Sequence, residues 1–303
     1  MELQWPLILF TTLVAWSAGV FGTQAVLALR GEAPKAQLSC WITAAVLLAA
    51  GGIAVFFHLE HFERIFNGFG HLTSGITQEL IAIVVLAVAA IVYLVYLRRD
   101  EGKVPAWLAV LSIALAAVLV VVMAHSYMMS ARPAWDSVLW IFYVLGNACV
   151  LGPATVALVC AIVKEPVRLA ATVALIGAAV NAVITIVYAV TLQFLEGSFT
   201  TVGYYSDPTM PTAPLVDVTA VGNVFTGELA PLMWIGVILV GAVVPLIAAL
   251  LEKRSGATPA ADGTAVASRA ELWMAVAVIA AVIGAICMRV VFYELGASVF
   301  MLY

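Results

Sequence analysis

The sequence predicts an all-α, polytopic membrane protein: a bundle of eight transmembrane helices with both termini outside. First, 65% of the 303 residues are hydrophobic and only 10% are charged, whereas about a quarter of a soluble domain is charged. Second, the apolar windows are about 20 residues long, enough to cross a hydrocarbon core of about 30 Å. Third, the Lys and Arg residues concentrate in alternate connections. We therefore expect the lipid bilayer as the surroundings, and no nucleic-acid partner.

Each apolar window is expected to be a helix, because backbone polar groups in lipid must be paired within the segment. None of the windows shows the alternating pattern of a barrel strand. We treat the whole chain, residues 1–303, as one integral-membrane domain. The predicted spans are 7–29, 38–57, 77–97, 105–126, 138–163, 168–194, 229–251 and 271–294.

The connections predict the orientation through the positive-inside rule. One set holds ten basic residues and the opposite set holds only Arg64 and Arg132. The first set should be cytoplasmic, which places both termini and the loops 58–79 and 196–228 outside. No basic residue precedes the first apolar run, so we interpret that run as a retained helix rather than a cleaved signal. The ten are Arg30, Lys35, Arg98, Arg99, Lys103, Lys164, Arg168, Lys253, Arg254 and Arg269.

The four cysteines, Cys40, Cys149, Cys160 and Cys287, fall inside predicted spans without CxxC spacing. They are interpreted as small buried apolar residues. We expect no iron–sulfur cluster of the four-cysteine kind and no metal site in this chain.

The stretch from His58 to Glu79 holds three of the four histidines and lies between two apolar windows. A histidine and a carboxylate at the outer ends of neighbouring helices suit hydroquinone oxidation, which needs acceptors for two protons. Both groups can titrate near neutral pH. We predict a quinol-binding site at His58 and Glu79, with Arg64 facing a quinone oxygen. In the alternative interpretation, His58 bonds to backbone, Glu79 merely favours a helix N-terminus, and Arg64 pairs with a nearby glutamate.

Two other features are candidates for function or partner docking. Arg289 is a charge deep in the last span, where functional roles are the default expectation; it could instead snorkel to the interface. The outer loop 196–228 lacks Lys and Arg and carries Tyr204 and Tyr205 beside three prolines. We interpret it as a docking surface, with a plain connecting loop as the alternative.

The aromatic residues near the fifth span, Trp135, Trp140 and Tyr143, are expected to form an outer interfacial belt. Asn147 and Asn181 are expected to make interhelical hydrogen bonds.

Two other functions compete with quinol oxidation. His58 and His125 both lie near outer helix ends and could ligate one b-type haem. A small-solute transporter is the third hypothesis, although few ionisable residues lie at mid-membrane to line a path.

Several short motifs lie in order along nearly the whole chain: Trp5-Pro6-Leu7, His58-Leu59, Arg64, Phe66-Asn67, Ser74-x-x-Thr77-x-Glu79, Pro133-x-Trp135-x-Ser137, Gly152-Pro153 and Arg289-x-x-Phe292-Tyr293. Together they resemble the membrane anchor subunit of dimethyl sulfoxide reductase and related complex iron–sulfur molybdoenzymes.

This resemblance implies an eight-helix anchor in the bacterial cytoplasmic membrane, with both termini periplasmic. It implies menaquinol binding by His58 and Glu79, without haem. Electrons would pass to a four-cluster ferredoxin-like iron–sulfur subunit and then to a molybdopterin catalytic subunit, both on the periplasmic face. The chain itself would perform only the quinol half-reaction and would not act on the terminal substrate.

Overall fold

The structure is a computed structural model, and it describes residues 3–58, 67, 69–194, 206–207, 210–214, 223–255 and 263–296. In this part of the chain, all the long elements are helical. A small antiparallel pair of strands, β1 (Ser206–Asp207) and β2 (Met210–Pro214), lies beyond the helices.

Within the described residues, eight helices are long and apolar enough to cross a membrane, which confirms the predicted fold class. The observed bounds differ from the predicted ones by at most three residues, at the seventh span, which runs Leu232–Arg254. That span begins with wide, π-helical turns and continues as an α-helix. The elements are α1 (Trp5–Arg30), α2 (Ala36–Phe56), α3 (Gly75–Arg99), α4 (Ala106–Ser126), α5 (Val138–Ile162), α6 (Arg168–Leu192), η3 (Leu232–Val243), α8 (Val244–Ser255) and α9 (Gly263–Glu294).

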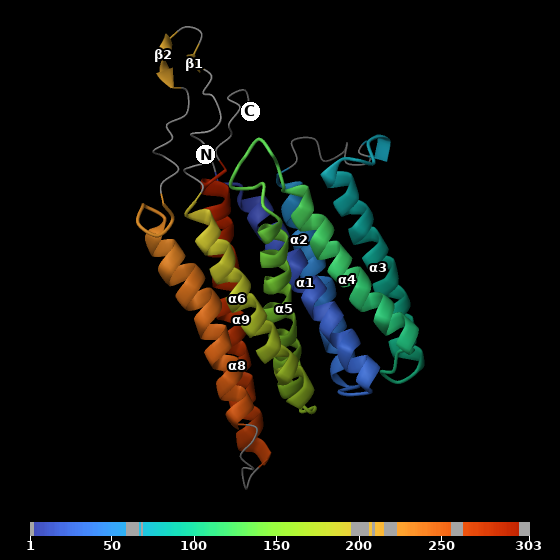
Figure 1. Ribbon diagram of the computed structural model, residues 1–303. Helices are drawn as coiled ribbons and strands as arrows, with labels where there is room; N and C mark the ends of the chain where they lie inside the picture. Colours follow the sequence, from blue (N-terminus) through green and yellow to red (C-terminus); the bar gives the residue numbers. More distant parts are fainter. Residues whose placement is uncertain are drawn as a thin grey trace.

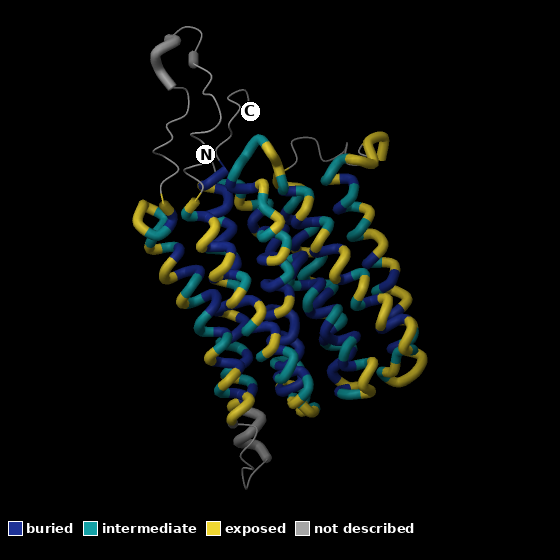
Figure 2. The backbone as a smooth tube through the Cα atoms, viewed as in Figure 1, coloured by how far each residue is buried: buried dark blue, intermediate teal, exposed yellow. Residues whose placement is uncertain are grey.

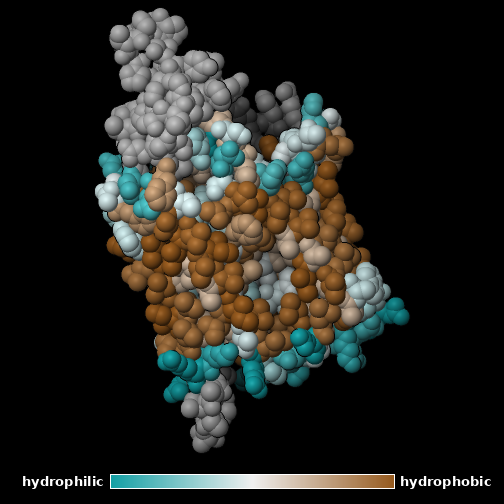
Figure 3. All heavy atoms as spheres, in the orientation of Figure 1, coloured by the Kyte–Doolittle hydropathy of each residue, from teal (hydrophilic) through white to brown (hydrophobic). Residues whose placement is uncertain are grey.

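The helices run alternately up and down, so that the described chain begins and ends at the same end of the bundle (Figure 1). The short links 31–35, 100–105 and 163–167 gather at the opposite end. This basic end carries the lysines of those links and the arginines at the adjoining ends of α1, α3 and α6. An apolar band separates the two polar ends of the molecule in Figure 3, as expected for a protein that spans a bilayer.

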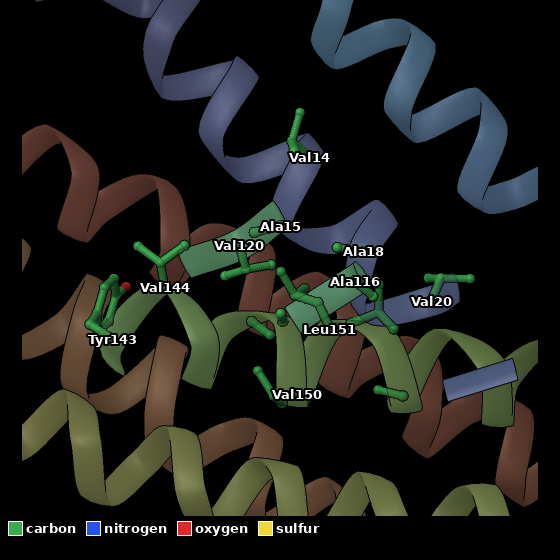
Figure 4. Packing of buried hydrophobic residues seen from close by; sticks show 14 of the residues in the cluster. Val14, Ala15, Ala18, Val20, Ala116, Val120, Tyr143, Val144, Val150 and Leu151 are labelled. Atoms are coloured by element: carbon green, nitrogen blue, oxygen red, sulfur yellow. The ribbon is translucent and has the colours of Figure 1, made fainter. Parts of the chain in front are cut away.

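The centre of the bundle is α5, which packs against α1 on one side and α6 on the other. Gly19 of α1 and Gly152 of α5 lie so close that a Cβ on either would collide with the backbone of the other helix. Small side chains such as Ala15 and Ala18 allow the same close approach (Figure 4). Lipid tails are as apolar as leucine, so this contact is stabilised by packing rather than by the removal of apolar surface from water.

The helices α2 and α3 lie at the periphery, and exposed residues follow much of α3 in Figure 2. At the basic end the two helices are joined, because Trp41 Nε1 donates to the Ala90 carbonyl at 2.8 Å. At the other end they present exposed apolar side chains. These are Ile53, Phe56, Phe57, Leu72 and Ile76.

The predicted outer aromatic belt is wrong, because Trp135, Trp140 and Tyr143 are buried in protein rather than turned to the lipid interface. Trp135 and Trp140 stack on Phe292 of α9, with ring centroids 4.8 and 3.9 Å away. Stacking on a neighbouring ring uses the large apolar faces of the indoles inside the bundle. These aromatics therefore fix α9 against α5.

The predicted interhelical bonding of Asn147 and Asn181 is confirmed. Asn147 Nδ2 donates to Asn181 Oδ1 at 3.0 Å, and Asn181 Nδ2 donates to the Gly241 carbonyl at 3.2 Å. These bonds connect α5, α6 and η3, and they lead to the buried arginine described below.

Candidate functional site

Glu79 is a buried carboxyl group at the non-basic end of the bundle, one turn into α3, and it is only 7% exposed. Its Oε1 forms a hydrogen bond with Ser126 Oγ, at the end of α4. Gly75 lies on the same face of α3, four residues earlier. A Cβ at Gly75 would lie 2.7 Å from the Cβ of Ser126, so only glycine allows α3 to start this close to α4.

The hydrogen bonds of Ser126 depend on the protonation state of Glu79. Ser126 Oγ lies 2.8 Å from the Met123 carbonyl and also contacts the Glu79 carboxyl group. A hydroxyl has a single proton to donate. With Glu79 ionised, Ser126 donates to the carboxylate; with Glu79 protonated, the acid donates to Ser126, which then donates to Met123. Either state of the carboxyl group is therefore satisfied, as a proton acceptor requires.

Two tyrosines from other parts of the chain lie near Glu79. Tyr127 follows Ser126, and Tyr293 lies near the end of α9; the two hydroxyls face each other. Burial raises the pKa of Tyr127 well above its usual value, and the nearby Glu79 and Tyr293 raise it further, against the opposing charge of Arg289. Tyr127 therefore stays protonated and can donate a hydrogen bond.

Arg289 lies at the inner side of these tyrosines and is completely buried. Its Nε donates to Thr11 Oγ1 at 2.8 Å, and its Nη2 donates to the Thr11 carbonyl at 3.2 Å. Nη1 donates to Asn147 Oδ1 at 2.9 Å and to the Ala285 carbonyl at 3.0 Å. The alternative that Arg289 snorkels to the interface is therefore wrong. We call Glu79, Ser126, Tyr127, Arg289 and Tyr293 the carboxylate cluster.

The link between α4 and α5 holds the end of α9 in place. Trp135 Nε1 donates to the Phe292 carbonyl at 2.6 Å, and Arg132 donates to the Gly296 carbonyl. The Trp135 ring meets that of Tyr293 edge-on, with centroids 5.4 Å apart. The link therefore positions Tyr293 beside Tyr127. The side chain of Ser137 then caps α5 by accepting from the Leu139 amide.

The other predicted site residues are placed differently. His58 is exposed at the end of α2, and its Nδ1 lies 3.0 Å from Gln4 Oε1, next to the start of α1. Among the described residues, no hydrogen bond joins His58 to Glu79. His125 is exposed near the end of α4. Arg64, Tyr204 and Tyr205 lie outside the described residues.

Sequence reasoning did not assign Ser126, Tyr127 or Tyr293 to the site. Ser126 and Tyr127 follow an apolar run and resemble an ordinary helix end. Tyr293 stands one helical turn after Arg289, a spacing that places both side chains on one face. This spacing was the available signal for Tyr293.

The fold and the carboxylate cluster define a class: a polytopic membrane protein with a carboxyl group buried at one end of the bundle and apolar side chains exposed beside it. The chain matches the family model described as the DMSO reductase anchor subunit (DmsC) over residues 1–258. The chain therefore belongs to this family, and it is a membrane anchor of a DMSO reductase-type complex that associates with the catalytic subunits and with membrane lipids. A search of curated proteins gives no match. The matched range ends before Arg289 and Tyr293, so the family match does not include these two residues.

Proposed function

We propose that this anchor oxidises menaquinol at the Glu79 end of the bundle and passes the electrons to an iron–sulfur subunit. The observation that carries the proposal is Glu79 itself. It is a carboxyl group buried in a membrane helix, where a charge has a high free energy and functional roles are the default expectation. Its hydrogen bond to Ser126 accommodates both protonation states.

The exposed apolar side chains at the ends of α2 and α3 support quinol entry from the lipid. Phe57 is 80% exposed and Leu72 is 61% exposed, and both precede the buried turn that holds Glu79. An isoprenoid tail can rest on such a surface while the polar head group reaches the carboxyl group. His58, exposed at the same end, then accepts a proton on an imidazole nitrogen and releases it to water. Arg64 is the group proposed to face a ring oxygen.

The reaction balances as follows. The quinol loses two protons, one to the Glu79 carboxylate and one to His58, and two electrons, which leave one at a time to an iron–sulfur cluster of the adjacent subunit. The quinone leaves into the lipid. The anchor needs no haem of its own in this scheme, because the clusters of the partner accept the electrons directly.

The proposed orientation follows from the charge of the links. The basic end faces the cytoplasm, so the Glu79 end and both termini face the periplasm of a bacterial cytoplasmic membrane. A four-cluster ferredoxin-like subunit and a molybdopterin catalytic subunit dock on that face, with the loop that carries Tyr204 and Tyr205 as a contact surface.

The test compares two buried carboxyl groups at opposite ends of the bundle. Glu79→Gln and Glu252→Gln are made in the full complex; Glu252 is 6% exposed and lies in α8 at the basic end. Reduction of the iron–sulfur clusters by menadiol, a soluble naphthoquinol, is followed spectroscopically. The loss of a general base lowers the rate by about 10²- to 10⁴-fold, so Glu79→Gln should be slowed by that factor and Glu252→Gln should match the wild type. Equal rates in all three proteins would exclude Glu79 as the proton acceptor.

A further inference from the structure

Arg289 is a positive charge inside the membrane that no carboxylate neutralises directly. Every oxygen to which it donates is neutral: the hydroxyl and carbonyl of Thr11, the side-chain oxygen of Asn147 and the carbonyl of Ala285. Among the described residues, no carboxylate oxygen lies within 4.0 Å of the guanidinium. A buried guanidinium without an anion is costly, so a second group near it should carry negative charge at some stage.

Two tyrosines, Tyr127 and Tyr293, connect Arg289 to the Glu79 carboxyl group, because each interacts with both groups. Tyr127 interacts electrostatically with Glu79 on one side and with Arg289 on the other. Tyr293 does the same from α9. Tyr143 of α5 also faces the guanidinium. Glu294, which follows Tyr293 in the sequence, is exposed, so in the described part of the chain Glu79 is the buried carboxyl group at this end of the bundle.

The hydroxyl of Tyr293 has an unused hydrogen-bonding capacity. The residue is 4% exposed, and its Oη has no hydrogen-bond partner among the described residues. It faces Tyr127, but not with the distance and angles of an ordinary hydrogen bond. A buried hydroxyl without a partner is destabilising. Unlike the Tyr188 hydroxyl, that of Tyr293 interacts with a guanidinium and a carboxyl group, where it can donate to an oxygen of a ligand.

We propose that Tyr293 is a further binding residue for the quinol head group and that Arg289 is its positioning residue. The Tyr293 hydroxyl donates to the ring oxygen that has just lost a proton to Glu79. The uncompensated charge of Arg289, acting through Tyr293 and Tyr127, stabilises the resulting quinol anion. The anion then releases its second proton and two electrons, the electrons passing to the iron–sulfur subunit. This inference rests on the proposed function and extends the site inward from Glu79, across α4 to α9.

The α4–α5 link holds the end of α9, and with it Tyr293, in place. The bonds from Trp135 to Phe292 and from Arg132 to Gly296 fix the residues on either side of Tyr293. A head-group donor has to be held in place before the ligand arrives, because a pre-organised group loses less entropy on binding.

The test uses Tyr293→Phe, with Tyr188→Phe as the matched control. Tyr188 is a second fully buried tyrosine of the same aromatic cluster, and its hydroxyl also lacks a partner. Neither change removes a hydrogen bond of the fold, so both complexes should assemble. With menadiol as donor, Tyr293→Phe should lower kcat by about tenfold with little change in KM, because the hydrogen bond is made to the quinol anion and not to the quinol itself. Tyr188→Phe should leave both constants unchanged.

Arg289→Lys and Arg289→Gln then test the charge. Lysine keeps the charge and should retain most of the rate, whereas Arg289→Gln should lower kcat by about tenfold, because the quinol anion loses its nearby cation. Viologen-driven turnover by the soluble subunits reports assembly in each variant. If the complex with Arg289→Gln fails to assemble, the comparison of Tyr293→Phe with Tyr188→Phe still tests the proposal.

The outcomes separate the inference from the proposed function. If Glu79→Gln is slow while Tyr293→Phe and Tyr188→Phe both behave as wild type, quinol oxidation at Glu79 stands and the role of Tyr293 and Arg289 is refuted. Equal losses in Tyr293→Phe and Tyr188→Phe would also refute it, because the effect would then be structural. If Glu79→Gln is as fast as wild type, the proposed function itself fails.

Discussion

Two buried polar clusters lie at opposite ends of this bundle, and they differ in the chemistry they can support. The carboxylate cluster contains an acid, a guanidinium and two phenols. The amide cluster at the basic end contains only neutral groups: Gln37 Nε2 donates to the Gln24 carbonyl at 3.0 Å, and Tyr93 donates to Gln37 Oε1 at 3.0 Å. Near them, Ser112 and the side-chain amide of Gln24 are buried without partners. Both clusters join helices, but only the first contains a carboxyl group.

The two clusters suggest that, in this membrane anchor, the groups that join the helices differ from the groups that react. Neutral amides can hold helices together through directional bonds without introducing a charge into lipid. A buried acid with an arginine nearby introduces two charges that have to be accommodated. Substitutions in the carboxylate cluster should therefore lower the rate of quinol oxidation more than they lower the stability of the fold. Substitutions in the amide cluster should change the stability more than the rate.

The largest effect is expected when α3 is displaced from α4. Gly75→Ala would place a Cβ 2.7 Å from that of Ser126 and push Glu79 away from its partner. A displacement of about 1 Å at a reacting group can cost about 10²-fold in rate, so menadiol oxidation should fall by about that factor. Gly52→Ala is the control, because a Cβ at Gly52 meets nothing within 4 Å. Equal rates in both variants would show that the close approach at Gly75 is unimportant.

A smaller effect is expected for Ser126→Ala, which removes the hydrogen-bond partner of Glu79 without moving a helix. A lost bond to a charged group is worth about 1.5–3 kcal/mol, which predicts a rate about tenfold lower. Ser112→Ala is the control in the same helix, because Ser112 is buried but unpartnered. Steady-state menadiol oxidation distinguishes them, and a larger loss in Ser112→Ala would contradict the assignment.

A still smaller effect is expected for His58→Ala. The imidazole is exposed and bonded to Gln4, and water can replace an exposed proton acceptor. Interactions of exposed groups contribute up to about 1 kcal/mol, so the rate should fall by about fivefold or less. His71→Ala, another exposed histidine of the same loop, should have no effect. A complete loss of activity in His58→Ala would mean that His58 binds the head group directly.

No effect on quinol oxidation is expected for Gln24→Leu in the amide cluster. Both side-chain atoms of Gln24 that could form hydrogen bonds are unpartnered and buried. Replacing an unpartnered amide with an apolar group of similar size should stabilise the fold by about 1 kcal/mol. Thermal unfolding of the complex in detergent measures this, and a lower Tm would show that the amide has a partner, such as a buried water.

The eight spans could be predicted closely because length, hydropathy and the spacing of charges determine membrane helices independently of tertiary contacts. Glu79 could be selected because it is a carboxyl group beside an apolar window. The burial of Trp135 and Trp140 could not be foreseen, since their amphipathic rings suit a lipid interface equally well. Only the stacking on Phe292 distinguishes the two environments.

The tyrosines of the site were missed for a related reason. Tyr127 and Tyr293 are 166 residues apart in the sequence, and nothing local indicates that the ends of α4 and α9 meet. Their meeting depends on the bonds from the α4–α5 link to α9, which are properties of the folded chain. Arg289 could be selected as a candidate because a charge in lipid has a high free energy. Its neutral partners could not be predicted, because they come from α1, α5 and α9 itself.

The central claim is that Glu79 accepts a proton from quinol, and infrared difference spectroscopy tests it most directly. Spectra of the intact complex are recorded before and after menadiol delivers its electrons. The account predicts a new carboxylic acid C=O band that is present in the wild type and in Glu252→Gln and absent in Glu79→Gln. The same band in Glu79→Gln, or no band in the wild type, would contradict it.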